Sequence, residues 1–229
     1  MTPATVALEE VEVDYRGRGR ALGPLSLRIG DGEIVALVGP SGCGKSTALR
    51  LLAGLEPATR GVVQRAPGRG ETSVVFQAPT LAPWMSAAAN VALPLELSGT
   101  PKPEARARAL EALERVGLAG AGASRPAQLS GGMAMRASLA RALVTQPRLL
   151  MLDEPFAALD PGGREMVASV VRRLKEESVT LVIATHLPDL TRPHCDRAIH
   201  LEQGRIRWAG VPADSPALDP VDALDGGAA

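Results

Sequence analysis

The chain has 229 residues, and its 25 Lys and Arg residues balance its 25 Asp and Glu residues, so the formal net charge is zero. A protein built mainly to coat nucleic acid or anionic lipid carries a large positive excess, so we expect no nucleic-acid partner. The two cysteines, Cys43 and Cys195, lie far apart in the sequence, which excludes a disulfide framework and a paired-cysteine metal site.

The beginning of the chain has the pattern of an antiparallel sheet. Apolar and polar residues alternate in Val11–Val13 and again in Leu25–Ile29, and a turn rich in Gly and Arg separates the two stretches at 16–20. Such alternation around a short turn is typical of antiparallel strands with one buried face. We therefore predict an antiparallel β subdomain over Val6–Arg28.

Later apolar runs show no such alternation. They are Ile34–Val38, Ser73–Phe76, Leu149–Leu152 and Thr180–Ala184. Short unbroken apolar runs suit the strands of a parallel sheet that is covered on both faces. The runs alternate with helical patterns, which predicts an α/β fold with a mostly parallel core sheet.

Helical patterns lie between and after these runs, at Thr47–Ala53, Glu104–Val116, Gly132–Val144 and Gly163–Glu176. One face of the second carries Leu110, Leu113 and Val116. One stripe of the last carries Met166, Val167, Val170, Val171 and Leu174. An apolar stripe on an otherwise polar helix is the face that it turns to the core.

The organisation of the chain follows from these elements. The Ala-rich segment at 80–130 is mostly helical and interrupts the core strands, which predicts an inserted helical subdomain over about 80–145. The end, 213–229, is rich in Pro, Gly and Asp and predicts a flexible tail. We predict a single domain over 1–212. No apolar run approaches the roughly 20 residues that span a bilayer, and the start lacks the layout of a signal peptide.

The first chemical signal follows the predicted strand at Ile34–Val38. It consists of Gly39, Pro40, Ser41, Gly42, Cys43, Gly44, Lys45, Ser46 and Thr47. This stretch matches GxxxxGK[ST], in which backbone N–H groups and a helix N-terminus surround phosphate oxygens. Lys45 can reach the β- and γ-phosphates, and the Ser46 hydroxyl can ligate Mg²⁺. The strand–loop–helix context makes a chance match improbable and predicts a nucleotide site.

Two adjacent carboxylates, Asp153 and Glu154, end another predicted strand. Ligands of open α/β sheets bind at the carboxyl ends of the strands. Asp153 suits Mg²⁺, directly or through water, and Glu154 suits polarising an attacking water. The alternative is a pair of acids that merely caps the strand. The nucleotide loop in the same chain favours the catalytic interpretation.

A third signal, Ser130-Gly131-Gly132, opens a predicted helix. A hydroxyl and two glycines before a helix form an anion-binding nest. An ordinary N-cap is the commoner meaning of such a sequence. Beside the first loop, it indicates either a second anion or a segment that completes the nucleotide site of another copy.

Together these segments resemble the nucleotide-binding subunit of an ABC transporter over nearly the whole chain. Gly39–Thr47 resembles Walker A, Leu129–Met133 the signature, and Leu149–Glu154 Walker B with its catalytic acid. Four further matches follow in the family's order: Tyr15 resembles the aromatic residue that stacks on adenine, Gln77 the Q-loop glutamine, Ala158–Asp160 the D-loop and His186 the switch histidine. Individually, Tyr15 could be a hairpin residue, Gln77 a turn residue and His186 a helix cap. Their common order favours the functional interpretation.

The resemblance implies a P-loop NTPase that binds ATP and Mg²⁺ and works as a head-to-tail dimer with a second copy or a homologous ATPase subunit. The implied catalytic residues are Lys45, Gln77, Glu154 and His186. The implied metal ligands are Ser46, Gln77 and Asp153. The implied nucleotide contacts, besides Gly39–Thr47, are Tyr15, Ser130, Gly131, Gly132 and Asp160. An integral-membrane permease would be the direct partner, a periplasmic or lipid-anchored solute-binding protein an indirect one, and the cytoplasmic face of the cell membrane the location.

The subgroup is indicated by the residues after Gln77. Leu81–Met85, with its Pro-Trp pair, and Asn90–Leu97 resemble the nitrate/sulfonate/taurine group of bacterial importers. This implies a small solute of the nitrate, sulfonate, taurine or pyrimidine-like class. We expect Ala78–Leu97, led by Trp84, to contact the permease; the alternative is that Trp84 is a core residue.

Two departures from the family and three rival functions remain. Met135 stands where a glutamine is usual, and the stretch between Lys45 and Gln77 is short, so its strands around Gly61–Thr72 are expected to be trimmed. The rivals are an ABC ATPase without a membrane partner, an exporter or lipid-trafficking cassette, and a nucleotide-dependent binding module without turnover. Glu154 and His186 argue against the last.

Overall fold

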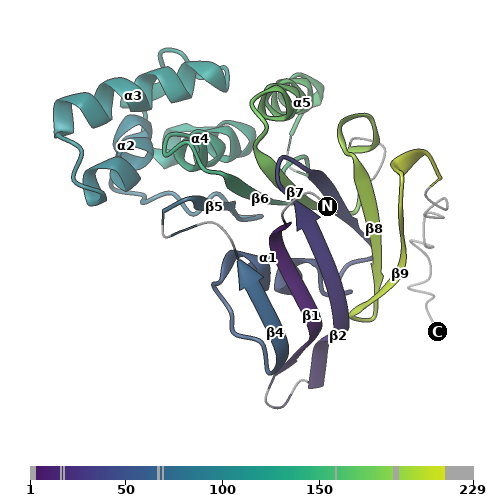
Figure 1. The fold of residues 1–229 in the computed structure, drawn as a ribbon. Helices are drawn as coiled ribbons and strands as arrows, with labels where there is room; N and C mark the ends of the chain where they lie inside the picture. The colour runs from purple at the N-terminus through teal and green to yellow at the C-terminus, as the bar shows by residue number, and fades with distance from the viewer. Residues whose placement is uncertain are drawn as a thin grey trace, which may run out of the picture.

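The computed structural model describes residues 4–15, 17, 19–65, 68, 70–157, 159–187 and 191–214. Figure 1 shows a central sheet with a smaller antiparallel sheet below it and a group of helices to one side. Of the tail predicted over 213–229, all but the first two residues lie outside the described part. Two residues of the predicted turn at 16–20 lie outside it as well.

The central sheet confirms the predicted parallel core. Six strands of the described chain form it, in the order β5-β6-β7-β3-β8-β9. They are β3 (Ile34–Val38), β5 (Thr72–Val75), β6 (Leu149–Asp153), β7 (Thr180–Thr185), β8 (Arg197–Glu202) and β9 (Arg205–Gly210). The pairs run parallel except β8–β9, which is an antiparallel hairpin. The four predicted strands match to within one residue at each end.

The core strands are apolar throughout because both faces of the sheet are covered. Every residue of β3, β6 and β7 is buried. Ile34 and Ala36 face a cluster that includes residues of the helices described below, whereas Val35 and Leu37 face a second cluster under the antiparallel sheet. Successive side chains point to opposite faces of a strand, so two-sided cover requires apolar residues at consecutive positions.

Helices α1 (Lys45–Ala53) and α5 (Pro161–Glu176) cover opposite faces of this sheet. Leu49 of α1 is buried in the cluster shared with the antiparallel sheet. Val167 and Val171 of α5 are buried in the other cluster, as the predicted stripe requires. The helix α1 begins directly after the nucleotide loop, so its packing fixes the position of that loop.

The antiparallel sheet predicted at the beginning of the chain is present, in the order β2-β1-β4. Its strands are β1 (Ala4–Tyr15), β2 (Gly19–Gly30) and β4 (Arg60–Arg65). Among the residues described between Lys45 and Gln77, β4 alone joins this sheet, which fits the short sequence there.

The inserted helices α2 (Ala87–Leu97), α3 (Lys102–Arg115) and α4 (Gly131–Leu143) form what we call the helical lobe, with 3-10 turns at Ala121–Ala123 and Pro126–Gln128. The apolar stripe predicted Leu110 on the buried face of α3, and this was wrong, because Leu110 is 44% exposed. Ala105, Ala109 and Leu113 form its buried face instead. Small alanines let neighbouring helices approach closely, so α3 packs on its alanine face and Leu110 lies outside the contact. No helix in the described part of the chain combines the length and the apolar character that crossing a bilayer requires.

Candidate active site

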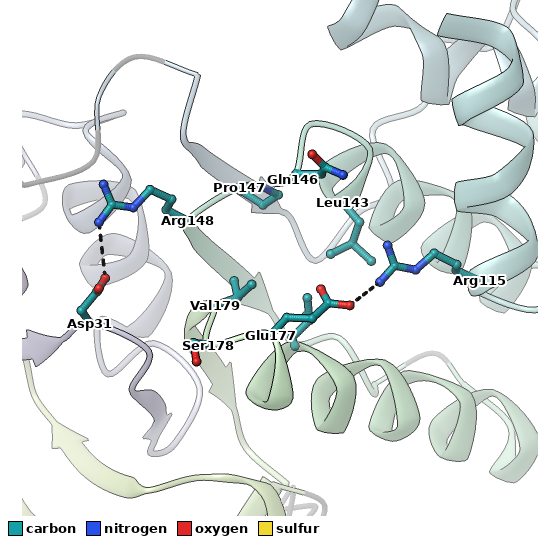
Figure 2. Close-up of a pocket in the computed structure, with 10 residues that line it drawn as sticks. Asp31, Arg115, Leu143, Gln146, Pro147, Arg148, Glu177, Ser178 and Val179 are labelled. Atoms are coloured by element: carbon teal, nitrogen blue, oxygen red, sulfur yellow. Dashed lines mark hydrogen bonds and ion pairs between the residues drawn. The ribbon is translucent and has the colours of Figure 1, made fainter. Parts of the chain in front are cut away.

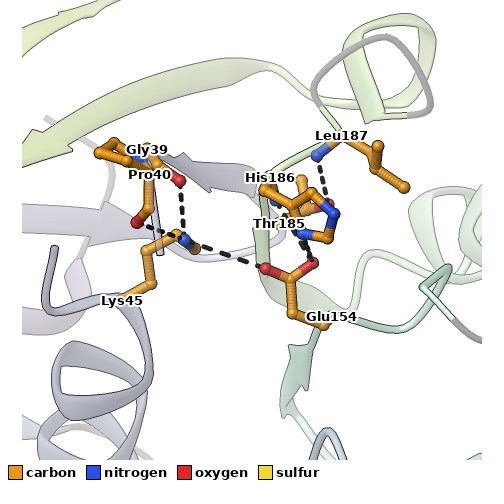
Figure 3. Close-up of polar contacts among 7 residues, drawn as sticks. All are labelled: Gly39, Pro40, Lys45, Glu154, Thr185, His186 and Leu187. Atoms are coloured by element: carbon orange, nitrogen blue, oxygen red, sulfur yellow. Dashed lines mark hydrogen bonds and ion pairs between the residues drawn. The ribbon is translucent and has the colours of Figure 1, made fainter. Parts of the chain in front are cut away.

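The predicted chemical residues converge because parallel strands end at one edge of the sheet. β3 leads into the nucleotide loop, β6 into Glu154 and β7 into His186. β7 pairs with both β3 and β6, so these three ends are neighbours. Figure 3 shows Lys45, Glu154 and His186 turned toward one another at this edge. The fold therefore brings together residues that are far apart in the sequence.

The glycines of the loop are required by conformation and by space. Gly39, Gly42 and Gly44 all have positive φ, at 152°, 78° and 108°. A Cβ on Gly44 would lie 2.7 Å from Leu22 Cδ2 and 2.9 Å from the Ala21 carbonyl oxygen. Only glycine combines this backbone conformation with so close an approach to β2. The loop thus passes close to β2 at Gly44, in a conformation that only glycine adopts easily.

Lys45 is buried, and its ammonium lies inside this loop. Nζ donates to the carbonyl oxygens of Gly39 at 2.7 Å and Pro40 at 3.1 Å. It also lies 3.9 Å from Glu154 Oε1, as Figure 3 shows. A buried cation requires such compensation, and the same donors suit phosphate oxygens.

Glu154 is buried and held from two sides. Its Oε2 lies 2.9 Å from His186 Nδ1 and accepts the backbone N–H of His186 at 3.3 Å. The backbone N–H of Glu154 donates to the Ala184 carbonyl oxygen at 2.9 Å. Its φ of 51° is left-handed, which is uncommon for a residue with a side chain and is found at functional sites. The carboxylate therefore has a defined orientation between Lys45 and His186.

Asp153 is the second buried acid. Burial, the largest cause, raises the pKa of its carboxyl above the usual value, and a hydrogen bond with Ser46 acts against this. Its Oδ1 is buried and has no hydrogen-bond partner within the described residues. An unpartnered carboxylate oxygen beside a hydroxyl is the kind of oxygen-donor set that Mg²⁺ uses together with substrate phosphates. Ser46 and Asp153 therefore fit the predicted metal.

The signature serine and the D-loop aspartate both cap helices. Ser130 Oγ accepts the Met133 N–H at 3.2 Å at the start of α4, and Asp160 Oδ1 accepts the Gly163 N–H at 2.9 Å at the start of α5. The capping interpretation of Ser130 is therefore confirmed, and it leaves the helix N-terminus accessible. A Cβ on Gly131 would meet nothing within 4 Å. Ala158 of the predicted D-loop lies outside the described residues.

Tyr15 and Gln77 make no hydrogen bond or ion pair with Lys45, Glu154 or His186 among the described residues. Gln77 is exposed and follows β5, whose partner β6 ends at Asp153. Tyr15 ends β1, is partly buried, and packs against the apolar cluster that contains α1. Its aromatic stacking with a base stays a prediction.

Sequence reasoning missed the support that the β8–β9 turn gives to the loop. The Gly204 N–H donates to the Cys43 carbonyl oxygen at 2.9 Å, and the Gly204 carbonyl oxygen accepts the Gly23 N–H at 2.8 Å. The turn thus ties the loop to β2. A glycine in the turn is the only sign of this in the sequence.

A hollow of about 410 Å³ lies at the opposite edge of the sheet, next to the residues that begin β6 and β7. Figure 2 shows two ion pairs in its wall, Arg115–Glu177 at 2.9 Å and Arg148–Asp31 at 3.6 Å. Since ligands of such sheets bind at the carboxyl ends of the strands, this hollow is not the nucleotide site.

Comparisons with known proteins agree with this geometry. Residues 22–157 match the model of the ABC transporter family. The Fe(3+) ions import ATP-binding protein of Agrobacterium fabrum is 42% identical over 221 residues, which cover 93% of this chain and 62% of that protein. The sulfate/thiosulfate import ATP-binding protein of Gloeobacter violaceus is 41% identical over 220 residues, which cover 92% of this chain and 63% of that protein. The chain thus spans less than two thirds of these relatives.

Solved structures match over more of their length. The dimeric ATP-binding cassette MJ0796, in a post-hydrolysis state bound to ADP and Pi, superposes with a TM-score of 0.83 and 32% identity, covering 90% of this chain and 98% of that chain. The structure of cbiO1 from Clostridium perfringens, part of the transporter complex cbiONQ, gives a TM-score of 0.79 and 28% identity, covering 91% of this chain and 89% of that chain.

Proposed function

Because the chain belongs to the ABC transporter family, we propose that it powers the uptake of a small solute through a membrane permease. As an ATP-binding cassette it binds and hydrolyses ATP. The observation that carries the proposal is the cluster of Lys45, Glu154 and His186 at the glycine loop. The named relatives are ATP-binding proteins of importers.

The nucleotide is held by the loop and its surroundings. The N–H groups of Gly39–Thr47 surround the β- and γ-phosphates, and Lys45 exchanges its bonds to the Gly39 and Pro40 carbonyls for phosphate oxygens. Tyr15, at the end of the neighbouring strand, stacks on the adenine. Ser46, Asp153 and Gln77 would hold Mg²⁺, which would supply positive charge beside the phosphate oxygens.

Hydrolysis uses the pair formed by Glu154 and His186. The carboxylate of Glu154 orients a water molecule and accepts its proton as the water oxygen bonds to the γ-phosphorus and the bond to the ADP oxygen breaks. His186, held by its backbone and its ring to Glu154 Oε2, steadies the γ-phosphate and the water. Catalysis is then positioning and charge neutralisation, since the side chains form no covalent bond to phosphorus.

A second cassette completes each site. The solved relative MJ0796 is dimeric. Ser130 and Gly131 are exposed at the N-terminus of α4, where a partner's phosphate could be bound, and Asp160 is exposed at the start of α5. We assign these residues to the nucleotide site of the facing copy. ATP would lie between them and the glycine loop of that copy.

The permease contact falls on Ala78–Leu97. Trp84 is 75% exposed, so the alternative that it is a core residue is wrong. Leu97, in the same segment, is also exposed. Large exposed aromatic residues serve as interface anchors because one side chain removes much apolar area from water. Docking there would place the chain at the cytoplasmic face of the membrane.

Two classes of solute have support. The Pro83–Trp84 pair favours the nitrate, sulfonate, taurine or pyrimidine-like class, whereas the names of the relatives favour Fe³⁺ or sulfate and thiosulfate. The permease and the solute-binding protein select the solute, so transport has to be measured in the assembled system.

The test is reconstitution with a candidate ABC permease from the same organism. The proposal expects co-purification with the permease and ATP turnover that rises when the solute-loaded binding protein is added to proteoliposomes. Export of solute from the vesicles would support the exporter alternative. A chain that hydrolyses ATP but never co-purifies with a membrane subunit would contradict the transport role.

A further inference from the structure

The loop between Gln77 and α2 is held by two polar side chains of the helical lobe. We call residues 79–86 the 79–86 loop; it carries Trp84 near its end. One of the two side chains comes from α4, the helix that Ser130 caps, and the other comes from α2. Neither residue is among the predicted catalytic, nucleotide-binding or metal-binding residues, although Asn90 begins the segment that resembles the importer subgroup.

Arg141 of α4 hydrogen-bonds to the beginning of the loop. Its Nη1 donates to the Thr80 carbonyl oxygen at 2.9 Å. Its Nη2 donates to the Pro79 carbonyl oxygen at 3.2 Å and to Thr80 Oγ1 at 2.9 Å. Thr80 has a left-handed φ of 48°, so the guanidinium engages a turn that is itself unusual. The planar fork of arginine matches several fixed acceptors at once, which a lysine ammonium on its flexible stem cannot do.

Asn90 of α2 is fully buried and hydrogen-bonds to the later part of the loop. Its Oδ1 accepts the Ala82 N–H at 2.7 Å. Its Nδ2, which has two hydrogens, shares them among the carbonyl oxygens of Ala82 at 3.2 Å, Met85 at 3.3 Å and Ser86 at 3.1 Å. Ser86 also caps α2 through the Ala89 N–H. A buried network that satisfies its polar groups in this way is rigid.

The connection on the other side of the loop is different. Val75 ends β5 as a buried strand residue, and Gln77 and Ala78 are exposed between it and Pro79. The loop is thus bonded to α2 and α4, while the half-buried Phe76 and two exposed residues join it to the sheet.

From this arrangement we propose that Arg141 is a positioning residue for ATP hydrolysis. It fixes the 79–86 loop to α4, so that the loop that follows Gln77 and the helix that Ser130 caps keep one relative position. Arg141 touches no nucleotide in this account and acts through the loop. The inference rests on the proposed roles of Gln77 and Ser130.

The matched control is Arg136, which lies on the same helix and also donates to two backbone carbonyls. Its Nη1 bonds to Val116 at 3.0 Å and Gly117 at 3.1 Å, away from the loop. Arg141→Lys and Arg136→Lys therefore remove the same kind of bond from one helix, and a general loosening of α4 would affect both alike.

Two readouts separate the roles. In Arg141→Lys, amide hydrogen exchange in the 79–86 loop should rise at least 10-fold, and kcat for ATP should fall roughly 10-fold with KM within about 2-fold, the split expected when positioning rather than nucleotide binding is lost. Arg136→Lys should change neither. Equal effects of the two variants, or unchanged loop exchange in Arg141→Lys, would overturn the proposal.

If Arg141→Lys does not fold, Thr80→Ala tests the proposal instead, because it removes only the contact between Arg141 and the Thr80 hydroxyl. Exchange in the loop should then rise by a smaller factor, and unchanged exchange would again overturn the proposal. Hydrogen exchange needs no turnover, so a failure of the proposed ATP mechanism is distinguishable from a failure of this clamp.

Discussion

Replacing Trp84 by Ala separates permease docking from folding. Since Trp84 is 75% exposed, about three quarters of a side chain that buries up to roughly 250 Å² is available to a partner, on the order of 190 Å². At about 25 cal/mol per Å² this corresponds to at most about 5 kcal/mol, and the cost of ordering the interface reduces it to about 2–3 kcal/mol. Trp84→Ala should therefore weaken permease binding by roughly 30-fold or more, while the free energy of unfolding falls by no more than about 1 kcal/mol.

The assay is titration of the detergent-solubilised permease with the purified cassette, next to ATP turnover of the cassette alone. Turnover without permease should stay near that of the unaltered chain. Leu55→Ala is the matched control, because Leu55 is also exposed, at 58%, but lies just after α1 and outside the 78–97 segment. Permease affinity that is unchanged in Trp84→Ala, or reduced equally in Leu55→Ala, would refute the assigned docking surface.

Two further predictions concern single side chains. Tyr15→Ala should weaken ATP binding by about 1–2 kcal/mol, the scale of stacking on a base, and Tyr15→Trp should restore it; equal affinities in calorimetry would make Tyr15 structural only. Burial raises the pKa of the Cys195 thiol from 9.0 to about 12, so at pH 8 the native protein should hold roughly 1,000-fold less of its reactive thiolate than an ordinary cysteine would. At pH 8, iodoacetamide should therefore alkylate Cys195 far more slowly in the native protein than after unfolding, as measured by mass spectrometry. Labelling of the native protein at the rate of the unfolded chain would contradict the burial described.

The sequence was sufficient for the core strands and the loop because local pattern decides both. An unbroken apolar run such as Ile34–Val38 fits only a sheet covered on two faces, and Gly44 is required by its own backbone conformation. The orientation of α3 was not predictable in the same way. Leu110 repeats at helical spacing, yet the neighbouring helices pack on the alanine face, which a pattern of large apolar residues does not reveal.

The sequence did not indicate the hydrogen bonds that hold the 79–86 loop, although Asn90 begins a segment that resembles the importer subgroup. Arg141 and Asn90 bond mainly to backbone carbonyl oxygens. Every residue has the same backbone carbonyl whatever its side chain, so the sequence does not mark these acceptors. Which carbonyls point toward a guanidinium or an amide is decided by tertiary packing. In the proposed transport role the solute is selected by separate chains, so the sequence of this chain does not predict it.

The measurement that tests the account most directly is single-turnover ATP hydrolysis by Glu154→Gln beside Glu165→Gln. Glu154 is buried between Lys45 and His186, whereas Glu165 is an exposed residue of α5 that pairs with Arg172. Glu154→Gln should bind ATP with unaltered affinity and cleave it at least ~100-fold more slowly, the scale of losing a positioned base, while Glu165→Gln should cleave at the normal rate. Cleavage at an undiminished rate in Glu154→Gln would contradict the assignment of this cluster as the hydrolytic site.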